Sequence, residues 1–277
     1  WLMSADPDFP QGGNISLEKL PATAKEMFEY DVAILIDPDP RDFPTALTGL
    51  LRRFVAEQNG GLVYVAGEKY SSAFFRSTPM KPVHEMIPVL ADLAGAGELP
   101  GITGFSTREW PLRPTRAAST HDSTRLASNP LRNNQRWEEL PGIYWSFRVR
   151  KAKPGATVLF RYSDPSRRVA GKDQPLLAWQ YFAGGRTIFL GSDETWRWRV
   201  STDEIYDQFW MQTIRHLTEA RLAGGRRSVL QSDRKAYDFG DTVRISAMLQ
   251  DESFQPLEAE VQALSVEGPE GETQELR

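Results

Sequence analysis

Two short segments are continuously apolar, a pattern that predicts strands covered on both faces. Residues 32–36 are apolar and rich in β-branched side chains, and residues 62–66 repeat this pattern. A strand with one face in solvent would alternate apolar and polar residues instead. Between the two runs, apolar residues recur at helical spacing over 46–55, and Gly60-Gly61 ends that helix. Strand, helix and strand in this order predict a right-handed βαβ unit with parallel strands.

The second half of the chain predicts further strands and one long helix. Strands are expected at 156–163, 176–182 and 186–192, and Gly184-Gly185 predicts a tight hairpin between the last two. Apolar positions over 203–222 define a long amphipathic helix. Residues from about 70 to 150 are less regular, with a short helix expected over 83–93. We expect this stretch to be a long insertion that lies over the sheet.

The pattern changes again in the last 50 residues. Residues 242–249 alternate apolar and polar positions, as a half-buried antiparallel strand does, and 261–266 predicts another strand. Residues 228–277 amount to about half of a β-sandwich domain. The expected fold is therefore α/β, with a doubly wound, mostly parallel sheet over residues 1–224 and a partial antiparallel β-sandwich over 228–277. We also expect a chain that starts at Trp1 and stops inside a sandwich to be a fragment of a longer protein.

Composition and charge narrow the classes of function. The chain has no cysteine, which excludes disulfides, thiolate metal sites and cysteine nucleophiles. Its net charge is −4, so it lacks the overall basic charge typical of nucleic-acid binding, and no nucleic-acid partner is expected. No apolar run approaches the roughly 18 residues that a membrane span needs, so we expect membrane attachment only through segments outside this chain.

Several stretches together resemble a known family. They lie at 30–37, 60–67, 87–89, 136–141, 153–156 and 185–199, and the most specific is Thr195-Trp196-Arg197-Trp198-Arg199. They resemble the glutamine amidotransferase-like (class I, flavodoxin-like) domains of large, uncharacterised bacterial envelope proteins. The tail resembles the start of a macroglobulin-like or immunoglobulin-like sandwich. The resemblance implies a location on the periplasmic or extracellular side of the bacterial cell envelope. It also implies partners that are other domains of the same larger chain or other envelope proteins.

The same resemblance argues against catalysis. Active members place a cysteine on a strand-to-helix elbow, with a histidine and a glutamate after a later strand. Here the elbow falls at about 65–67 without a nucleophile, and the later strand ends at Ser192-Asp193-Glu194 without a histidine. The three histidines, His84, His121 and His216, lie elsewhere. The sequence therefore predicts a non-catalytic module for binding or scaffolding, with no cofactor.

Five acidic residues follow the predicted strands. Ligands of doubly wound sheets sit beyond the carboxyl ends of the strands. The residues expected there are Asp37, Asp39, Glu68, Asp193 and Glu194. They could bind a hard divalent cation or serve as general acids and bases of a metal-dependent enzyme. The favoured alternative is structural: Asp37 and Asp39 cap turns or helix starts, and Asp193 or Glu194 pairs with Arg197 or Arg199.

A second candidate site is the run Trp196, Arg197, Trp198 and Arg199. Alternating indole and guanidinium planes could stack on a sugar or a peptide. In an extended segment the two tryptophans would share one face and the two arginines the other. The favoured alternative is that the tryptophans anchor the segment to the core. A serine nucleophile among Ser71, Ser72 and Thr78 is disfavoured, and His216 is expected to be a half-buried helix residue.

Overall fold

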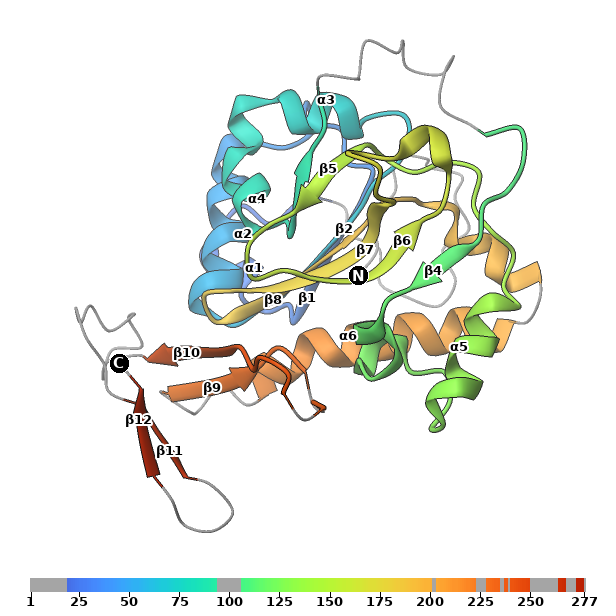
Figure 1. Ribbon diagram of the computed structural model, residues 1–277. Coiled ribbons are helices and arrows are strands. Elements are labelled where there is room, and N and C mark those ends of the chain that lie inside the picture. Colours follow the sequence, from blue (N-terminus) through green and yellow to red (C-terminus); the bar gives the residue numbers. More distant parts are fainter. Residues whose placement is uncertain are drawn as a thin grey trace.

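The computed structural model describes residues 19–93, 106–200, 203–222, 228–234, 237–238, 240–249, 264–267 and 273–276. Its centre is a six-stranded sheet in the order β1-β2-β8-β7-β6-β4 (Figure 1). The strands are β1 (Val32–Ile36), β2 (Gly61–Val65), β8 (Gly185–Leu190), β7 (Gln174–Phe182), β6 (Thr157–Tyr162) and β4 (Leu112–Pro114). Each strand that the apolar runs predict is present, within about two residues of its expected ends.

The sheet is mixed, and the expectation of a mostly parallel, doubly wound sheet is not met. β1, β2 and β8 run parallel, which confirms the βαβ unit. β8 to β7, β7 to β6 and β6 to β4 are antiparallel pairs. The tight turn at Ala183-Gly184 reverses the chain between β7 and β8, and β4 comes from the expected insertion. The molecule is therefore a mixed α/β fold in which only three neighbouring strands are parallel.

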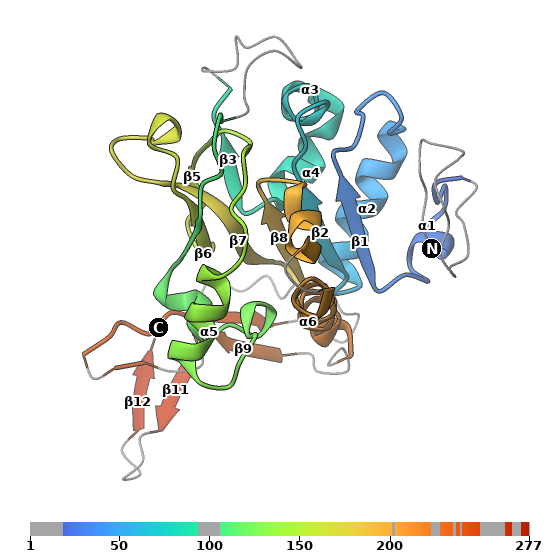
Figure 2. The same cartoon turned by 90° about the vertical axis from the view of Figure 1, so that its right-hand side faces the viewer.

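Helices cover both faces of the sheet (Figure 2). One face carries α2 (Thr45–Glu57), α3 (Ser71–Arg76) and α4 (Lys81–Met86), and the other carries α5 (Pro130–Glu138) and α6 (Asp203–Leu222). Successive residues of β2 serve opposite faces: Leu62 and Tyr64 pack with α2, whereas Val63 and Val65 pack with α6. Burial on both faces explains why β2 is continuously apolar. For β1 the expectation of two covered faces is wrong, because this strand lies at the edge of the sheet and Ile34 and Ile36 are exposed.

The stretch from 70 to 150 is folded against this framework. It contains the 3₁₀ turns η1 (Thr78–Met80), η2 (Arg116–Ser119) and η3 (Asp122–Thr124), and the strands β3 (Val89–Ala91) and β5 (Val149–Ala152), which pair with each other. The helix expected over 83–93 is wrong from residue 87 on, because α4 ends at Met86. Ile87 precedes Pro88 and takes an extended conformation, ψ 132°, as a residue before proline does.

The remaining elements are short. α1 (Ala24–Met27) begins with a capping box formed by Thr23 and Glu26. η4 (Pro165–Arg167) and η5 (Glu194–Val200) are 3₁₀ turns. Within the described part of the chain, no helix combines the length and the apolarity needed to cross a membrane.

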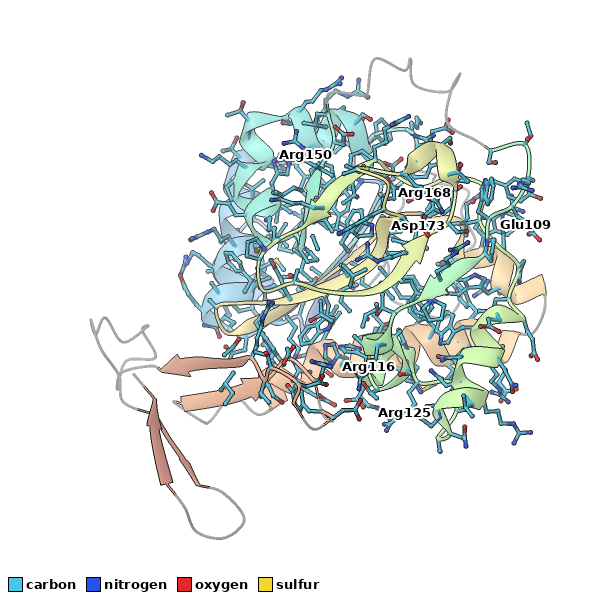
Figure 3. All side chains as sticks on the ribbon, in the orientation of Figure 1. Glu109, Arg116, Arg125, Arg150, Arg168 and Asp173 are labelled. Carbon is cyan, nitrogen blue, oxygen red and sulfur yellow. The ribbon has the colours of Figure 1, made fainter. Side chains whose placement is uncertain are left out.

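The tail forms two small antiparallel pairs. β9 (Ser228–Ser232) pairs with β10 (Ile245–Leu249), and β11 (Leu264–Glu267) pairs with β12 (Thr273–Leu276). Arg116 of η2 forms ion pairs with Asp238 and Asp241, which connect the tail to the insertion (Figure 3). The expected strands over 242–249 and 261–266 correspond to β10 and β11, although 261–263 lie outside the described residues. The β-sandwich and the division into two domains stay predictions.

Candidate functional site at the carboxyl edge of the sheet

Three chain segments meet at one edge of the parallel strands. β1, β2 and β8 are neighbours with the same direction, so their carboxyl ends lie together. Asp37 follows β1, Glu68 lies just beyond β2, and Asp193-Glu194 lies just beyond β8. We call these four residues the carboxyl edge. They lie together because neighbouring parallel strands end on the same side. That these residues form a ligand or metal site stays a prediction.

The charges of the carboxyl edge act on Asp193. The pKa of its carboxyl is raised to about 6, although the residue as a whole is exposed. The largest cause is the protein atoms around it, which displace water from the charged form, and the negative charges of Asp37, Glu194 and Glu68 add to the effect. Asp193 therefore carries a proton in weakly acidic solution, when an ordinary aspartate would be ionised.

Asp37 has a structural role in this edge. Its Oδ1 accepts hydrogen bonds from the Tyr70 N–H at 3.0 Å and from the Ser71 hydroxyl at 3.0 Å, and its Oδ2 accepts one from the Lys69 N–H at 3.1 Å. Its backbone is left-handed, φ 40°, which is uncommon outside glycine. The side chain lies against Gly67, where an added Cβ would stand 2.5 Å from the Asp37 Cβ. Asp37 thus joins the end of β1 to the start of α3.

Ser71, the candidate nucleophile of this region, has its hydroxyl engaged in structural hydrogen bonds. Ser71 is fully buried. Its hydroxyl donates to Asp37 and accepts from the Tyr64 hydroxyl and the Gly67 N–H, each at 3.0 Å. His84 donates from Nε2 to the carbonyl oxygen of Phe74 at 2.9 Å. Ser71 and His84 therefore serve separate structural hydrogen bonds and form no nucleophile–base pair.

Asp39 and Glu194 also have specific partners. Arg41 donates to Asp39 from its backbone N–H and its guanidinium at 2.6–3.1 Å, and these bonds lower the pKa of Asp39. Glu194 is 5% exposed, and its Oε2 accepts from the N–H groups of Tyr144 and Trp145 at 2.6 and 3.1 Å. Glu194 also pairs with Arg197, whose Nε lies 3.3 Å from Glu194 Oε1, which is one of the pairings that the structural alternative offers.

The tryptophan–arginine run is a 3₁₀ helix, η5, and not an extended segment. In a 3₁₀ helix, residues three apart eclipse one another, so residues two apart point to different sides. Trp198 is 2% exposed and packs against Trp137 and Phe209, with ring centroids 5.5 and 5.2 Å away. Trp196 is 54% exposed. Anchoring to the core thus applies to Trp198 alone.

The two arginines of η5 both stack on aromatic rings. The Arg197 guanidinium lies 4.6 Å from the Tyr144 ring centroid and 4.7 Å from that of Trp196, and its Nε donates to Glu194 at 3.3 Å. Arg199 lies 4.2 Å from the Tyr206 ring centroid. Three residues at a spacing of three, Asp193, Trp196 and Arg199, are exposed, and we call them the exposed row.

A second group of polar residues lies elsewhere, and the sequence reasoning did not identify it. Among the described residues, one group of histidine and acidic side chains brings a ligand atom from each member within 4.8 Å of the others: Asp122, His216 and Glu219. The carboxyl edge forms no such group. His216 and Glu219 are three residues apart on α6, a spacing that puts both on one helix face, and this was the available signal.

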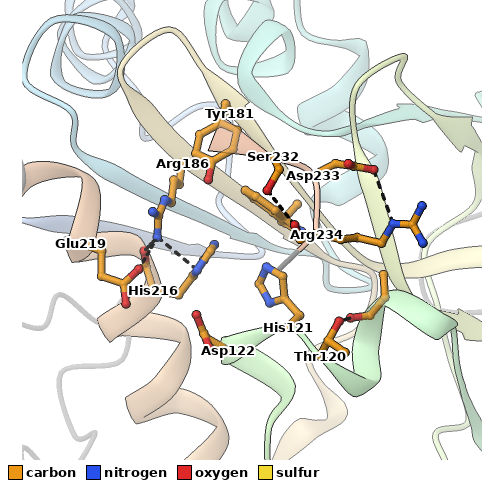
Figure 4. Close-up of a pocket in the computed structure, with 12 residues that line it drawn as sticks. Thr120, His121, Asp122, Tyr181, Arg186, His216, Glu219, Ser232, Asp233 and Arg234 are labelled. Atoms are coloured by element: carbon orange, nitrogen blue, oxygen red, sulfur yellow. Dashed lines mark hydrogen bonds and ion pairs between the residues drawn. The ribbon is translucent and has the colours of Figure 1, made fainter. Parts of the chain in front are cut away.

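The second group borders a cavity of about 80 Å³ (Figure 4). Arg186 lies in its wall at the start of β8, so the cavity is at the opposite end of that strand from Asp193. The ring centroids of His121 and His216 are 4.5 Å apart. The tail closes one side of the cavity with Ser232, Asp233 and Arg234. His216 is 5% exposed and so is buried, not half-buried as expected.

Two solved structures share this fold. The chain is similar to the cytoplasmic protein STM3548 from Salmonella typhimurium, with a TM-score of 0.50 and 14% identity over 72% of this chain and 76% of that chain. It is also similar to the cytoplasmic protein STM1381 from Salmonella typhimurium LT2, with a TM-score of 0.51 and 16% identity over the same shares. At such identities the likeness shows the fold alone. Neither a protein-family model nor a curated protein matches the chain.

The expected location in the bacterial cell envelope is contradicted by this comparison. Both solved structures are described as cytoplasmic proteins. The expectation came from the other modules that accompany the resembled domains, and no segment of this chain carried it. The resemblance to amidotransferase-like domains stays a prediction.

Proposed function

We propose that this protein is a non-catalytic binding module that takes a saccharide on the exposed row at the carboxyl edge. The observation that carries the proposal is Trp196. This large aromatic side chain is 54% exposed. It lies in η5, which follows the carboxyl end of β8, and ligands of α/β sheets sit beyond the carboxyl ends of parallel strands. An exposed indole leaves apolar area in water that a bound ligand would cover.

The surroundings of Trp196 suit a ring-shaped ligand with hydroxyl groups. The Arg197 guanidinium, itself held by Glu194 and Tyr144, restrains the indole in one orientation. The apolar C–H face of a sugar ring can then stack on the free indole surface without a large cost in side-chain entropy. Asp193 would accept hydrogen bonds from sugar hydroxyls, and the Arg199 guanidinium would donate to them.

The engagement of the other polar groups supports binding without catalysis. A transfer or hydrolysis reaction needs a nucleophile or base that can reach the substrate. The carboxylates of Asp37 and Glu194 are held by backbone N–H groups, and the Ser71 hydroxyl is buried. The groups at the edge that keep accessible carboxylates are Asp193 and Glu68.

One observation favours a second candidate, a carboxylate-based hydrolase. The raised pKa of Asp193 is of the kind that lets a carboxyl act as a general acid near neutral pH, and Glu68 is a second carboxyl at the same edge. The two candidates share a site and differ in outcome. A binding module returns its saccharide intact, whereas a hydrolase produces shorter sugars that chromatography detects.

The test uses maltose, cellobiose and trehalose as probes and measures tryptophan fluorescence and binding heat. We expect saturable binding of at least one of them, and we expect Trp196→Ala to weaken it about tenfold or more, as the loss of one stacking contact does. Trp110→Ala is the matched control, because Trp110 stacks on Arg108 in the insertion. Absence of binding to all three sugars, or equal affinity of the Trp196→Ala variant, would contradict the saccharide proposal. Release of shorter sugars would overturn the non-catalytic part and favour the hydrolase.

A further inference from the structure

We propose that Arg113, Arg161 and Arg168 bind a phosphate monoester, carried either by a free small molecule or by a phosphorylated peptide. We call these three residues the arginine cluster. They come from β4, from β6 and from the loop after η4, and they meet at Asp173, the residue before β7. Arg168 and Asp173 lie on the face of the molecule that Figure 3 shows. The cluster shares no residue with the exposed row, so it is a second site, independent of the proposed saccharide site.

The cluster lies in a strongly basic part of an acidic chain. Residues 106–173 contain 14 lysine and arginine residues against six aspartate and glutamate residues, a net charge of +8, whereas the rest of the chain carries −12. Nine of these 14 basic residues are exposed. The overall net charge of −4 therefore conceals a segregation of charge, and a basic surface raises the local concentration of anions.

Two arginines of the cluster face each other across a pair of strands. Arg113 of β4 is directly opposite Arg161 of β6 in the antiparallel register. Side chains at opposite positions share one face of the sheet, with Cβ atoms about 5 Å apart, and like charges there are destabilising. An anion between the two guanidiniums would replace this repulsion with attraction, so the register favours a negatively charged ligand.

A tight turn brings the third guanidinium to the same place. Val169 and Lys172 exchange backbone hydrogen bonds at 3.0 and 3.1 Å, and Gly171 between them has a left-handed backbone, φ 73°. The turn puts Arg168 beside Asp173, whose Oδ1 accepts a hydrogen bond from Arg168 Nε at 2.7 Å. The connection from β6 to β7 therefore holds this guanidinium next to the two strand arginines.

One carboxylate balances only part of the charge of the cluster. Asp173 Oδ2 lies 3.5 Å from Arg113 Nη1, and Oδ1 accepts from Arg168. Arg161 donates at 2.8 Å to the carbonyl oxygen of Asp173, which has no net charge. Three guanidiniums and one carboxylate leave an excess of two positive charges. Each guanidinium has five N–H donors, so most donors of the cluster have no acceptor among the residues that the structure describes.

The cluster is accessible, and its excess charge matches a phosphate monoester. The side chains of Arg113 and Arg168 are 59% and 40% exposed, whereas that of Asp173 is 11% exposed. A phosphate monoester has a charge of about −2 near neutral pH and three acceptor oxygens, which guanidiniums bind in pairs. A carboxylate brings one charge, as does each phosphate of a nucleic-acid backbone. The monoester therefore fits the cluster better than either of these groups.

The test measures binding to the full chain by calorimetry at neutral pH and low salt. The probes are inorganic phosphate and an alanine pentapeptide with blocked ends and a central phosphoserine. We expect the phosphopeptide to bind at least about tenfold more tightly than the same peptide with a central glutamate, because it brings about twice the charge. Similar affinity for inorganic phosphate would support recognition of the free anion, and weaker affinity would support recognition of a phosphorylated peptide.

Three results would overturn the proposal. They are absence of binding to both phosphate probes, equal affinity for the glutamate peptide, and tighter binding of a short oligothymidylate than of the phosphopeptide. The last result would assign the basic surface to phosphate diesters.

Four variants locate the site, each used only if its circular dichroism matches that of the parent. Arg113→Gln and Arg168→Gln each should weaken phosphopeptide binding about fivefold or more, since each removes a charged donor pair. Asp173→Asn should tighten it several-fold, because the amide keeps an acceptor for Arg168 and removes the competing negative charge. Arg132→Gln, at an exposed position of α5 in the same basic segment, is the matched control and should bind like the parent. Equal losses in Arg113→Gln and Arg132→Gln would show that general positive charge attracts the phosphate, and would overturn the assignment to the cluster.

Discussion

Acidic residues at the ends of β1 and β8 accept hydrogen bonds from backbone N–H groups that the sheet leaves unpaired. Asp37 serves residues 69 and 70, and Glu194 serves residues 144 and 145. A carboxylate in this role has its oxygens occupied and is a poor metal ligand, since buried backbone donors need their acceptors. Asp193 receives fewer such bonds, and its chemistry is correspondingly more adjustable.

The raised pKa of Asp193 gives a prediction for stability against pH. Its pKa is about 6 in the folded protein against an ordinary value of 3.8. Between these values the folded protein holds a proton that the unfolded chain has lost, so the free energy of unfolding falls as pH rises from about 4 to 6. In Asp193→Asn this decrease should be absent. Above pH 6 the variant should be more stable than the parent, because the folded parent holds Asp193 ionised in surroundings that disfavour its charge. The difference should be on the order of 1 kcal/mol, since solvent screens part of this effect.

Urea unfolding of both proteins at half-unit pH intervals measures this difference. Asp207→Asn, on α6, is the control for a change of net charge. A constant difference between parent and Asp193→Asn across the range would show that the pKa of Asp193 is not raised.

At the residue scale, the sequence could place the acidic residues but not their partners. The βαβ unit is enough to predict that Asp37 and Glu68 share an edge. The expectation of a parallel sheet put Asp193 there too, and β8 does run parallel to β2. The hydrogen bonds of Asp37 depend on its left-handed backbone, and those of Glu194 depend on the position of the loop at 144–145. Neither feature has a local signature in the sequence. The proximity of His121 and His216 likewise depends on tertiary packing.

At the element scale, η5 assigns opposite roles to two tryptophans two positions apart. Trp198 fills the space between Trp137 and Phe209, whereas most of the Trp196 indole is in solvent. Trp198→Ala should lower the free energy of unfolding by about 3–5 kcal/mol, as truncation of a buried aromatic does. Trp196→Ala should change it by no more than about 0.5 kcal/mol.

Urea denaturation of the two variants provides the comparison, with each the control for the other. Similar losses of unfolding free energy in both variants would mean that residues 194–200 are extended or mobile and do not form a 3₁₀ turn. A large loss in Trp196→Ala alone would also remove the basis for a stacking surface there.

The sequence predicted elements best where hydrophobic periodicity decides them. β2 and α6 are specified by their own residues, because burial on two faces or on one stripe dictates the pattern. β1 has the same apolar pattern as β2, although one of its faces exposes Ile34 and Ile36. η5 carries no such pattern, since seven residues mix two roles in a turn with a period of three. The expected helix over 83–93 failed because Pro88 outweighs the apolar spacing around it.

At the scale of the whole molecule, the tail is attached to the insertion by exposed ion pairs. Arg116 is 61% exposed where it meets Asp238 and Asp241. Such pairs contribute about 0–1 kcal/mol, so Arg116→Ala should leave the Tm almost unchanged. It should nevertheless speed hydrogen exchange in β9 and β10 several-fold, because the tail separates more often.

Mass-spectrometric hydrogen exchange measures this local effect, and 1 M salt should reproduce it in the parent by screening the same charges. Arg150→Ala is the matched control, because Arg150 is an exposed arginine of β5, away from the tail (Figure 3). Equal exchange in the Arg116→Ala variant and the parent would show that other contacts hold the tail.

The mixture of parallel and antiparallel pairs was beyond the sequence reasoning for a physical reason. A strand that is covered on both faces has the same continuously apolar pattern whichever direction its neighbours take, so the pattern does not reveal direction. Only the turn after β7 marks an antiparallel pair locally. The pairing of β4 with β6 depends on where the insertion returns to the edge of the sheet.

The order of the strands also constrains how the chain can fold. β2 lies beside β8, and Gly61 pairs with Arg186 about 125 residues further along the chain. The β6–β7–β8 meander needs only short loops to form, whereas closing the loop between β2 and β8 carries a far larger entropy cost. During synthesis, β1, α2 and β2 therefore leave the ribosome with one edge of β2 unpaired, and this edge stays unpaired until β8 has been made. The pairing of β2 with β8, which completes the carboxyl edge, is consequently a late step in assembly of the sheet.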